Sequence, residues 1–331
     1  MTFKVSLIIP IYNVASYIAD CLRSVYTQTY PLLEVILVND ATTDDSMTQA
    51  APWIKKLQER YRVKVVNHTW NRGLSASRNT GMEAATTDWI YFIDSDDEIT
   101  PNCIELLAAQ VEKYPDVDFV MGDIKYVGTD WHFPLTCDAY VKGNENILRD
   151  YTTYKWYPMA WNRLYRKSFL LQNNLFFKEG LLHEDELYSF QIATTSRAMA
   201  TVYEKTYIYK VRSSGSITAQ RKLKNFEDIL SILQEKYAYI LKQYQSGIYT
   251  IPRGYGMECL YGFALSLASN KLVRRVDKIR LLSAAKTLYR PLAVYSNARQ
   301  GLKLTLLKGL FSLPLGFVIL MLKWRLAMSK S

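Results

Sequence analysis

Hydrophobic and polar positions along the first hundred residues follow two alternating periods. Apolar runs of strand length, such as "KVSLIIP" (4–10) and "LEVILVND" (33–40), are separated by stretches of helical periodicity, such as "SYIADCLRSVYTQTY" (16–30). The same alternation continues with predicted helices at 46–61 and 73–85 and predicted strands at 62–68 and 89–94. Apolar strands joined by helices predict a parallel sheet covered by helices on both faces.

The pattern changes further along the chain. Residues 101–220 mix helices with short strands, of which "DFVMGDIKYVG" (118–128) is the clearest, and residues 221–300 are predicted to be mainly helical. The turn after the first strand, "PIYNVAS", contains no glycine, and no GxxxxGK[ST] loop occurs. A dinucleotide-binding Rossmann domain and a phosphate-cradling loop are therefore both disfavoured.

Acidic residues follow two of the predicted strands. Asp40 ends one strand, and "WIYFIDSDDEIT" (89–100) places Asp94, Asp96 and Asp97 within four positions after another. Because parallel sheets bind ligands beyond the carboxyl ends of their strands, we expect the two acidic segments to meet in one cleft. The second segment has two readings, an ordinary turn before Pro101 or a metal site. In the metal reading Asp94 and Asp96, at alternate positions, face one ion, and oxygen ligands favour Mg²⁺ or Mn²⁺.

Charge divides the chain unevenly. The net charge is +10, but residues 1–204 carry 19 Lys and Arg against 26 Asp and Glu, whereas residues 205–331 carry 22 against 5. A basic segment of this kind suits nucleic acid, anionic lipid or a phosphorylated substrate. Nucleic acid is disfavoured because no nucleic-acid motif occurs and the positive charge collects beside a hydrophobic tail.

That tail, residues 301–331, contains an uncharged run at 309–322 flanked by basic residues and Trp324. Fourteen residues interrupted by Pro314 fall short of the roughly 20 that a membrane-spanning helix needs. We expect a helix lying in the headgroup region of an anionic membrane, with a buried core helix and a short span as alternatives. The four cysteines show no paired spacing and the N-terminus reads as a strand without a signal peptide, so a cytoplasmic location is expected.

Four motifs, in order and spacing, resemble the signature of family 2 glycosyltransferases with the GT-A fold, an α/β fold with a mostly parallel sheet. They are "VSLIIPIYN" (5–13), "VNDATTDD" (38–45), "NRGLSASRNTG" (71–81) and "FIDSDDE" (92–98). Later segments, "WNRLYRKSFL" (161–170), "LLHEDELYSF" (181–190) and "VRSSGSIT" (211–218), resemble motifs of capsule and exopolysaccharide members. The chain departs from many relatives at Asn39 and at Ala41-Thr42, where Asp and Gly-Ser are common; both departures spare Asp40.

The resemblance implies roles for individual residues. Asp185 matches the general base that deprotonates the acceptor hydroxyl, and Glu184 would orient the site or the donor sugar. Asp94 and Asp96 match the metal-binding DxD motif, with Asp96 the more direct ligand of Mn²⁺ or Mg²⁺. The nucleotide-sugar, by resemblance a UDP-sugar, would contact a larger set: Pro10, Tyr12, Asp40, Asn71, Arg78, Asp94, Ser95, Asp96, Arg212 and Ser216.

These observations predict an inverting glycosyltransferase of bacterial surface polysaccharide synthesis. We expect a nucleotide-sugar-binding half at 1–100, an acceptor-binding and catalytic half at 101–220, a basic helical extension at 221–300 and a membrane-associating tail at 301–331. The acceptor would be a glycan. The positive charge of the tail region suits an acceptor linked to a lipid diphosphate, and we expect the protein to be peripheral at the inner face of the membrane. The alternative is a non-catalytic membrane-associated subunit that binds nucleotide-sugar, although the intact Asp94, Asp96 and Asp185 argue against it.

Overall fold

The computed structural model describes residues 3–211, 221–295 and 321. The chain divides into two compact units, Met1–Arg212 and Ser213–Ser331.

Within its described residues, the first unit is built on one mixed sheet. The strands are ordered β3-β2-β1-β4-β8-β6-β9-β5, and β7 pairs with β9. Their bounds are β1 (Val5–Ile11), β2 (Leu33–Asn39), β3 (Arg62–Asn67), β4 (Trp89–Phe92), β5 (Glu98–Ile99), β6 (Phe119–Val127), β7 (Tyr140–Lys142), β8 (Arg163–Arg166) and β9 (Ala198–Lys210).

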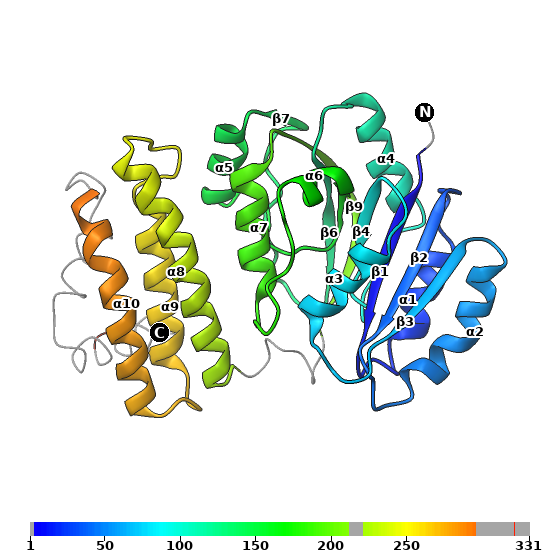
Figure 1. Ribbon diagram of the computed structural model, residues 1–331, viewed down its shortest axis with the longest axis horizontal. Helices are drawn as coiled ribbons and strands as arrows, with labels where there is room; N and C mark the ends of the chain where they lie inside the picture. The colour runs from blue at the N-terminus through cyan, green and yellow to red at the C-terminus, as the bar shows by residue number, and fades with distance from the viewer. Residues whose placement is uncertain (1–2, 212–220, 296–320, 322–331) are drawn as a thin grey trace. The chain divides into compact units, whose positions relative to one another are not determined.

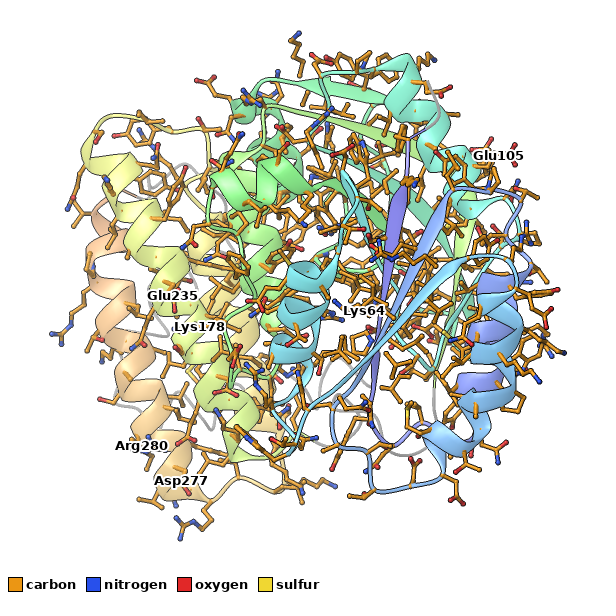
Figure 2. The ribbon with its side chains drawn as sticks, turned by 45° about the vertical axis from the view of Figure 1, so that its right-hand side comes forward. Lys64, Glu105, Lys178, Glu235, Asp277 and Arg280 are labelled. Carbon is orange, nitrogen blue, oxygen red and sulfur yellow. The ribbon has the colours of Figure 1, made fainter. Side chains whose placement is uncertain are left out.

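Helices cover both faces of this sheet, as Figure 1 shows with α3 in front of the strands and α1 behind them. The helices of the first unit are α1 (Ile18–Tyr26), α2 (Ser46–Gln58), α3 (Leu74–Ala84), α4 (Cys103–Lys113), α5 (Asn144–Thr152), α6 (Lys167–Gln172) and α7 (Glu184–Thr195). The sheet's centre is apolar: every residue of β1 is buried. The edge strand β3 is only partly covered and carries the exposed Lys64 labelled in Figure 2, a charge that discourages pairing with another chain.

The parallel arrangement predicted for the first hundred residues is confirmed, since β1, β2, β3 and β4 pair in parallel. Close packing of α3 on β1 depends on Gly81, where an added Cβ would lie 2.2 Å from Cγ2 of Ile8. Any larger side chain would force the helix away from the sheet.

The strands beyond residue 100 bring a second set of segments to the same edge. Strand β8 is antiparallel to both β4 and β6, so β6 runs in the direction of β4, and β9 is parallel to β6. The carboxyl ends of β1, β2, β4, β6 and β9 therefore share one edge of the sheet, which we call the carboxyl edge. Ligands of such sheets bind beyond this edge.

The second unit is helical over its described residues, as predicted for residues 221–300. It contains α8 (Leu223–Gln245), α9 (Tyr255–Ser269) and α10 (Arg275–Tyr295). Figure 2 labels Asp277 and Arg280 on α10; Arg280 forms an ion pair of 2.5 Å with Glu227 of α8. None of the described helices combines the length and apolarity needed to cross a membrane. The predicted tail, 301–331, lies outside the described residues except for Met321.

Candidate active site

The loop after β4 gathers three carboxylates. One oxygen from each of Asp94, Asp96 and Asp97 lies within 4.8 Å of the others. Asp94 and Asp96 are half-buried, whereas Asp97 is 1% exposed. The three residues therefore differ in environment despite being neighbours in the sequence.

Asp97 faces the protein interior and fastens the loop to β9. Its carboxylate accepts hydrogen bonds of 2.9 Å from the Tyr207 hydroxyl and from the backbone N–H of Lys210. The Tyr207 oxygen in turn accepts a 3.2 Å hydrogen bond from the backbone N–H of Asp94. Burial and the nearby Asp96 and Asp94 charges raise the pKa of Asp97 well above its usual range. The third acid of "DSDD" is thus an anchor for the loop.

Asp94 and Asp96 fit the ligands of a hard divalent cation. Both offer carboxylate oxygens at the carboxyl edge, and two carboxylates leave coordination positions for water and a substrate diphosphate. Asp97 fits this role less well, because it is 1% exposed and turns its carboxylate inward to Tyr207 and Lys210. The assignment of the cation to Asp94 and Asp96 remains a prediction that the donor set supports.

Arg78 on α3 connects α7 to the loop after β4 that carries Asp94, Asp96 and Asp97, which we call the acidic loop. Its Nη2 donates to Asp94 Oδ1 at 2.8 Å, and its Nη1 donates to Glu184 Oε1 at 2.6 Å. The side chain is only 2% exposed. Burial disfavours the charged guanidinium, but the carboxylates of Asp94 and Glu184 outweigh that effect and raise the pKa of Arg78. A cation so enclosed is held in one position and keeps its charge.

The first turn of α7 carries Glu184 and Asp185. The preceding residue, His183, adopts a left-handed conformation with φ of 64°. Asp185, half-buried, accepts a 2.9 Å hydrogen bond from the backbone N–H of Glu186. Desolvation, followed by the Glu184 charge, raises the pKa of Asp185 to about 8. Burial also raises the pKa of Glu184, in spite of Arg78. A carboxyl group with a pKa near neutrality can accept a proton under working conditions.

The carboxylate of Asp40, just after β2, accepts hydrogen bonds from the backbone of the turn before α3. It accepts hydrogen bonds of 2.8 Å from the backbone N–H groups of Arg72 and Gly73, and its Oδ1 lies 2.6 Å from Nδ1 of His68. Its exposed fraction is 2%. A carboxylate offers about four acceptor positions, so direct contact with a base N–H would use the remaining one. That contact stays a prediction.

The other predicted nucleotide contacts lie at different depths around the carboxyl edge. Pro10 is buried near the end of β1, while Tyr12 just beyond it is 43% exposed. Asn71 is exposed in the turn before α3, and Ser95 is 5% exposed in the acidic loop. Two further residues, Arg212 and Ser216, fall outside the described residues.

Sequence reasoning missed the partners that hold these groups. Tyr207 and the Arg78–Glu184 pair join segments separated by more than a hundred residues, with separations of 113 for Asp94 and Tyr207 and 106 for Arg78 and Glu184. The alternating aromatics of "EKTYIYK" (204–210) predict a strand, but not which ring meets the acidic loop. Only the pairing of β9 with β6 and β5 supplies that information.

Comparison with solved structures identifies the class of fold. The chain matches a GT-A glycosyltransferase, Staphylococcus aureus TarS 1–349 in complex with UDP-GlcNAc, with a TM-score of 0.67 and 20% identity over 87% of this chain and 81% of that one. A mannosyltransferase from Pyrobaculum calidifontis in complex with GDP-Man and Mn²⁺ matches with a TM-score of 0.54 and 20% identity over 89% and 83%. At these identities the likeness establishes the GT-A fold.

Sequence comparison establishes the family. The sequence model of "Glycosyl transferase family 2" matches residues 6–173, about half of the chain. The chain belongs to this family and is thus a glycosyltransferase by class. YibD of Escherichia coli (strain K12), named as a glycosyltransferase, is 31% identical over 63% of this chain, a match that spans 61% of YibD. EpsH of Bacillus subtilis (strain 168), also named as a glycosyltransferase, is 28% identical over 86% of this chain and 84% of EpsH.

Proposed function

We propose that this protein transfers a sugar from a nucleotide-sugar, with UDP as the nucleotide, to a hydroxyl group of a glycan in bacterial surface polysaccharide synthesis. One observation carries the proposal: Arg78 joins Asp94 of the acidic loop to Glu184, the residue before Asp185. Asp94, a candidate cation ligand, and Glu184, the sequence neighbour of the candidate base, are thereby held in one hydrogen-bonded assembly. An inverting transferase needs these two elements on opposite sides of the reacting carbon.

The donor occupies the carboxyl edge in this proposal. Asp94 and Asp96 would hold a divalent cation, which when bound would supply positive charge to stabilise the departing diphosphate. Tyr12, Asp40 and Asn71, which follow β1, β2 and β3 in turn, lie on the nucleoside side. The UDP-GlcNAc bound to TarS supports UDP as the nucleotide, and the Mn²⁺ of the mannosyltransferase supports the cation.

Asp185 acts as the general base. The acceptor hydroxyl oxygen attacks the anomeric carbon, the bond from that carbon to the phosphate oxygen breaks, and the proton passes to the Asp185 carboxylate. Glu184 and the fixed Arg78 hold the first turn of α7, so the base keeps its position relative to the acidic loop. A single displacement inverts the configuration at the anomeric carbon, and general-base assistance contributes about 10²–10⁴-fold to such a step.

The proposal also includes association of the protein with a membrane surface. Residues 205–331 carry 22 Lys and Arg against 5 Asp and Glu, and the apolar run at 309–322 is flanked by basic residues. Both features suit a peripheral position on an anionic membrane surface, the inner face for a cytoplasmic enzyme, and a lipid-diphosphate-linked acceptor.

The experiment follows UDP release by the full chain with UDP-GlcNAc, UDP-glucose or UDP-galactose, Mn²⁺ and acceptor oligosaccharides released from bacterial surface polysaccharide by mild acid. The proteins are wild type, Asp185→Asn and the surface control Asp116→Asn. We expect turnover by wild type and control, and at least about a hundredfold loss in Asp185→Asn with UDP binding retained. Near-full activity of Asp185→Asn contradicts the assignment of the base. Nucleotide binding without turnover by wild type favours the non-catalytic subunit.

A further inference from the structure

Aromatic rings form a continuous series between the acidic loop and the surface. Trp161 stacks on Tyr209 at 5.6 Å, Tyr209 contacts Tyr126 at 5.8 Å, Tyr126 contacts Trp131 at 6.1 Å, and Trp131 contacts Phe133 at 4.7 Å. We call these five residues the aromatic platform. Trp161 is 4% exposed, whereas Trp131 at the outer end is 58% exposed.

The inner end of the platform supports the acidic loop. Trp161 lies flat against Tyr207, with centroids 4.2 Å apart and an interplanar angle of 10°. Tyr207 is the residue whose hydroxyl bonds Asp97 and meets the backbone N–H of Asp94. The inner end of the platform is thus joined through Tyr207 to the loop that carries Asp94.

The order of the strands separates the platform from the donor side. Strand β4, which leads into Asp94, lies between β1 and β8, with β2 beyond β1 and with β6 and β9 beyond β8. The predicted nucleoside contacts Tyr12, Asp40 and Asn71 follow β1, β2 and β3 in turn, while the platform's Tyr126 and Tyr209 belong to β6 and β9. The platform thus lies across the acidic loop from the predicted donor position, where an acceptor belongs.

The surface around the outer end of the platform is apolar, and hydrogen bonds hold its backbone in place. Val127 and Val211, 42% and 46% exposed, join through a 3.0 Å hydrogen bond from the Val211 N–H to the Val127 carbonyl. The backbone N–H of Phe133 donates to the Tyr126 hydroxyl at 3.2 Å, and that of Trp131 to Thr129 Oγ1 at 3.1 Å. An exposed apolar patch with a polar rim marks a binding site, and one fixed in advance costs less to order on binding.

We propose that the aromatic platform binds the acceptor glycan, with a pyranose ring packed on Trp131. One face of a pyranose presents C–H groups, which pack against the electron-rich face of an aromatic ring, while its hydroxyls point outward to water and polar groups. The exposed Asp130 and His132 on either side of Trp131 supply such groups. This inference rests on the proposed function, because it names the acceptor side of the same reaction.

The test measures acceptor and donor dependence separately. Oligosaccharides released by mild acid from the surface polysaccharide of the producing bacterium serve as acceptors for the full-length protein. The variants are Trp131→Ala, the ring-retaining Trp131→Phe, and the control Trp53→Ala, which removes a partly exposed tryptophan of α2. UDP release without acceptor reports donor hydrolysis, and thermal melting checks folding.

We expect Trp131→Ala to raise the acceptor KM roughly tenfold while the donor KM and acceptor-free hydrolysis stay unchanged. Trp131→Phe should recover most of the acceptor affinity, and Trp53→Ala should match wild type. An unchanged acceptor KM in Trp131→Ala overturns the inference, as does a raised donor KM, which would place the nucleotide on the platform. Hydrolysis by wild type without transfer to any oligosaccharide also overturns it. Absence of both hydrolysis and transfer instead counts against the proposed function.

Discussion

The guanidinium of Arg78 lies 2.6 Å from the carboxylate of Glu184, in a setting where both side chains are nearly inaccessible to water. The second amino nitrogen of Arg78 contacts Asp94 at 2.8 Å. One cation thus balances two carboxylates, and a residue of α3 sets the spacing between the acidic loop and α7.

Replacing Arg78 should destabilise the protein strongly. Arg78→Met leaves Asp94 and Glu184 facing each other without a counter-charge, so we expect the free energy of unfolding to fall by about 3–5 kcal/mol. The control Lys142→Met removes one partner of the surface pair with Asp116 and should cost about 1 kcal/mol or less. Urea titration measures both values. Equal, small losses would show that the buried pair does not hold this part of the fold.

The raised pKa of Asp185 predicts a pH-dependent stability. Its pKa is about 8 in the folded protein and about 3.9 in an unfolded chain. Below both values Asp185 is protonated in either state; as pH rises from about 4 to about 8, the unfolded chain loses this proton first and the folded state loses stability. Asp185→Asn cannot ionise, so its stability relative to wild type should increase across this window, by more than about 1 kcal/mol between pH 5 and pH 8.

Urea titrations at pH 5 and pH 8 measure this difference, with Asp116→Asn as the control. The exposed Asp116 accepts a hydrogen bond from Lys142, which lowers its pKa, so it is ionised throughout the window. The effect of its substitution should not change between the two pH values. A parallel response of the two variants would mean that Asp185 is not the carboxyl group with the raised pKa.

Tyr207 should affect the metal dependence of donor binding without contacting the metal. Tyr207→Phe keeps the ring against Trp161 but removes the hydroxyl that bonds Asp97 and Asp94. Losing a hydrogen bond of about 1 kcal/mol should raise the Mn²⁺ concentration for half-maximal UDP binding about three- to tenfold. In Tyr61→Phe, which removes a buried hydroxyl bonded to Gln28, that concentration should remain as in wild type. If UDP binding depends on Mn²⁺ concentration in the same way in all three proteins, Tyr207 does not position the acidic loop.

Removal of residues 301–331 should release the protein from lipid while UDP binding persists. The deletion takes away the apolar run at 309–322 and its flanking charges. Sedimentation with vesicles containing phosphatidylglycerol measures the effect, and neutral phosphatidylcholine vesicles test the electrostatic contribution. If the truncated protein sediments with anionic vesicles as wild type does, the tail is not the anchor.

The sequence predicted those parts of the fold that depend on local periodicity. The parallel strands from Val5 to Phe92 and the helices between them follow from apolar runs and turn residues. The mixed topology beyond residue 100 was not predicted, because the antiparallel placement of β8 between β4 and β6 depends on contacts distant in sequence. The site divides in the same way: "FIDSDDE" marks the acidic loop, but only the fold shows that Asp97 turns inward to Tyr207.

Calorimetric titration of UDP, with and without Mn²⁺, tests the central claim most directly. The proteins are wild type, Asp96→Ala, and Asp116→Ala as a surface acid control. We predict UDP binding that strengthens with Mn²⁺ in wild type and in Asp116→Ala, and a loss of that metal-dependent binding in Asp96→Ala. Equal UDP binding in all three proteins, with or without Mn²⁺, would contradict the account and leave the acidic loop as a turn without a metal.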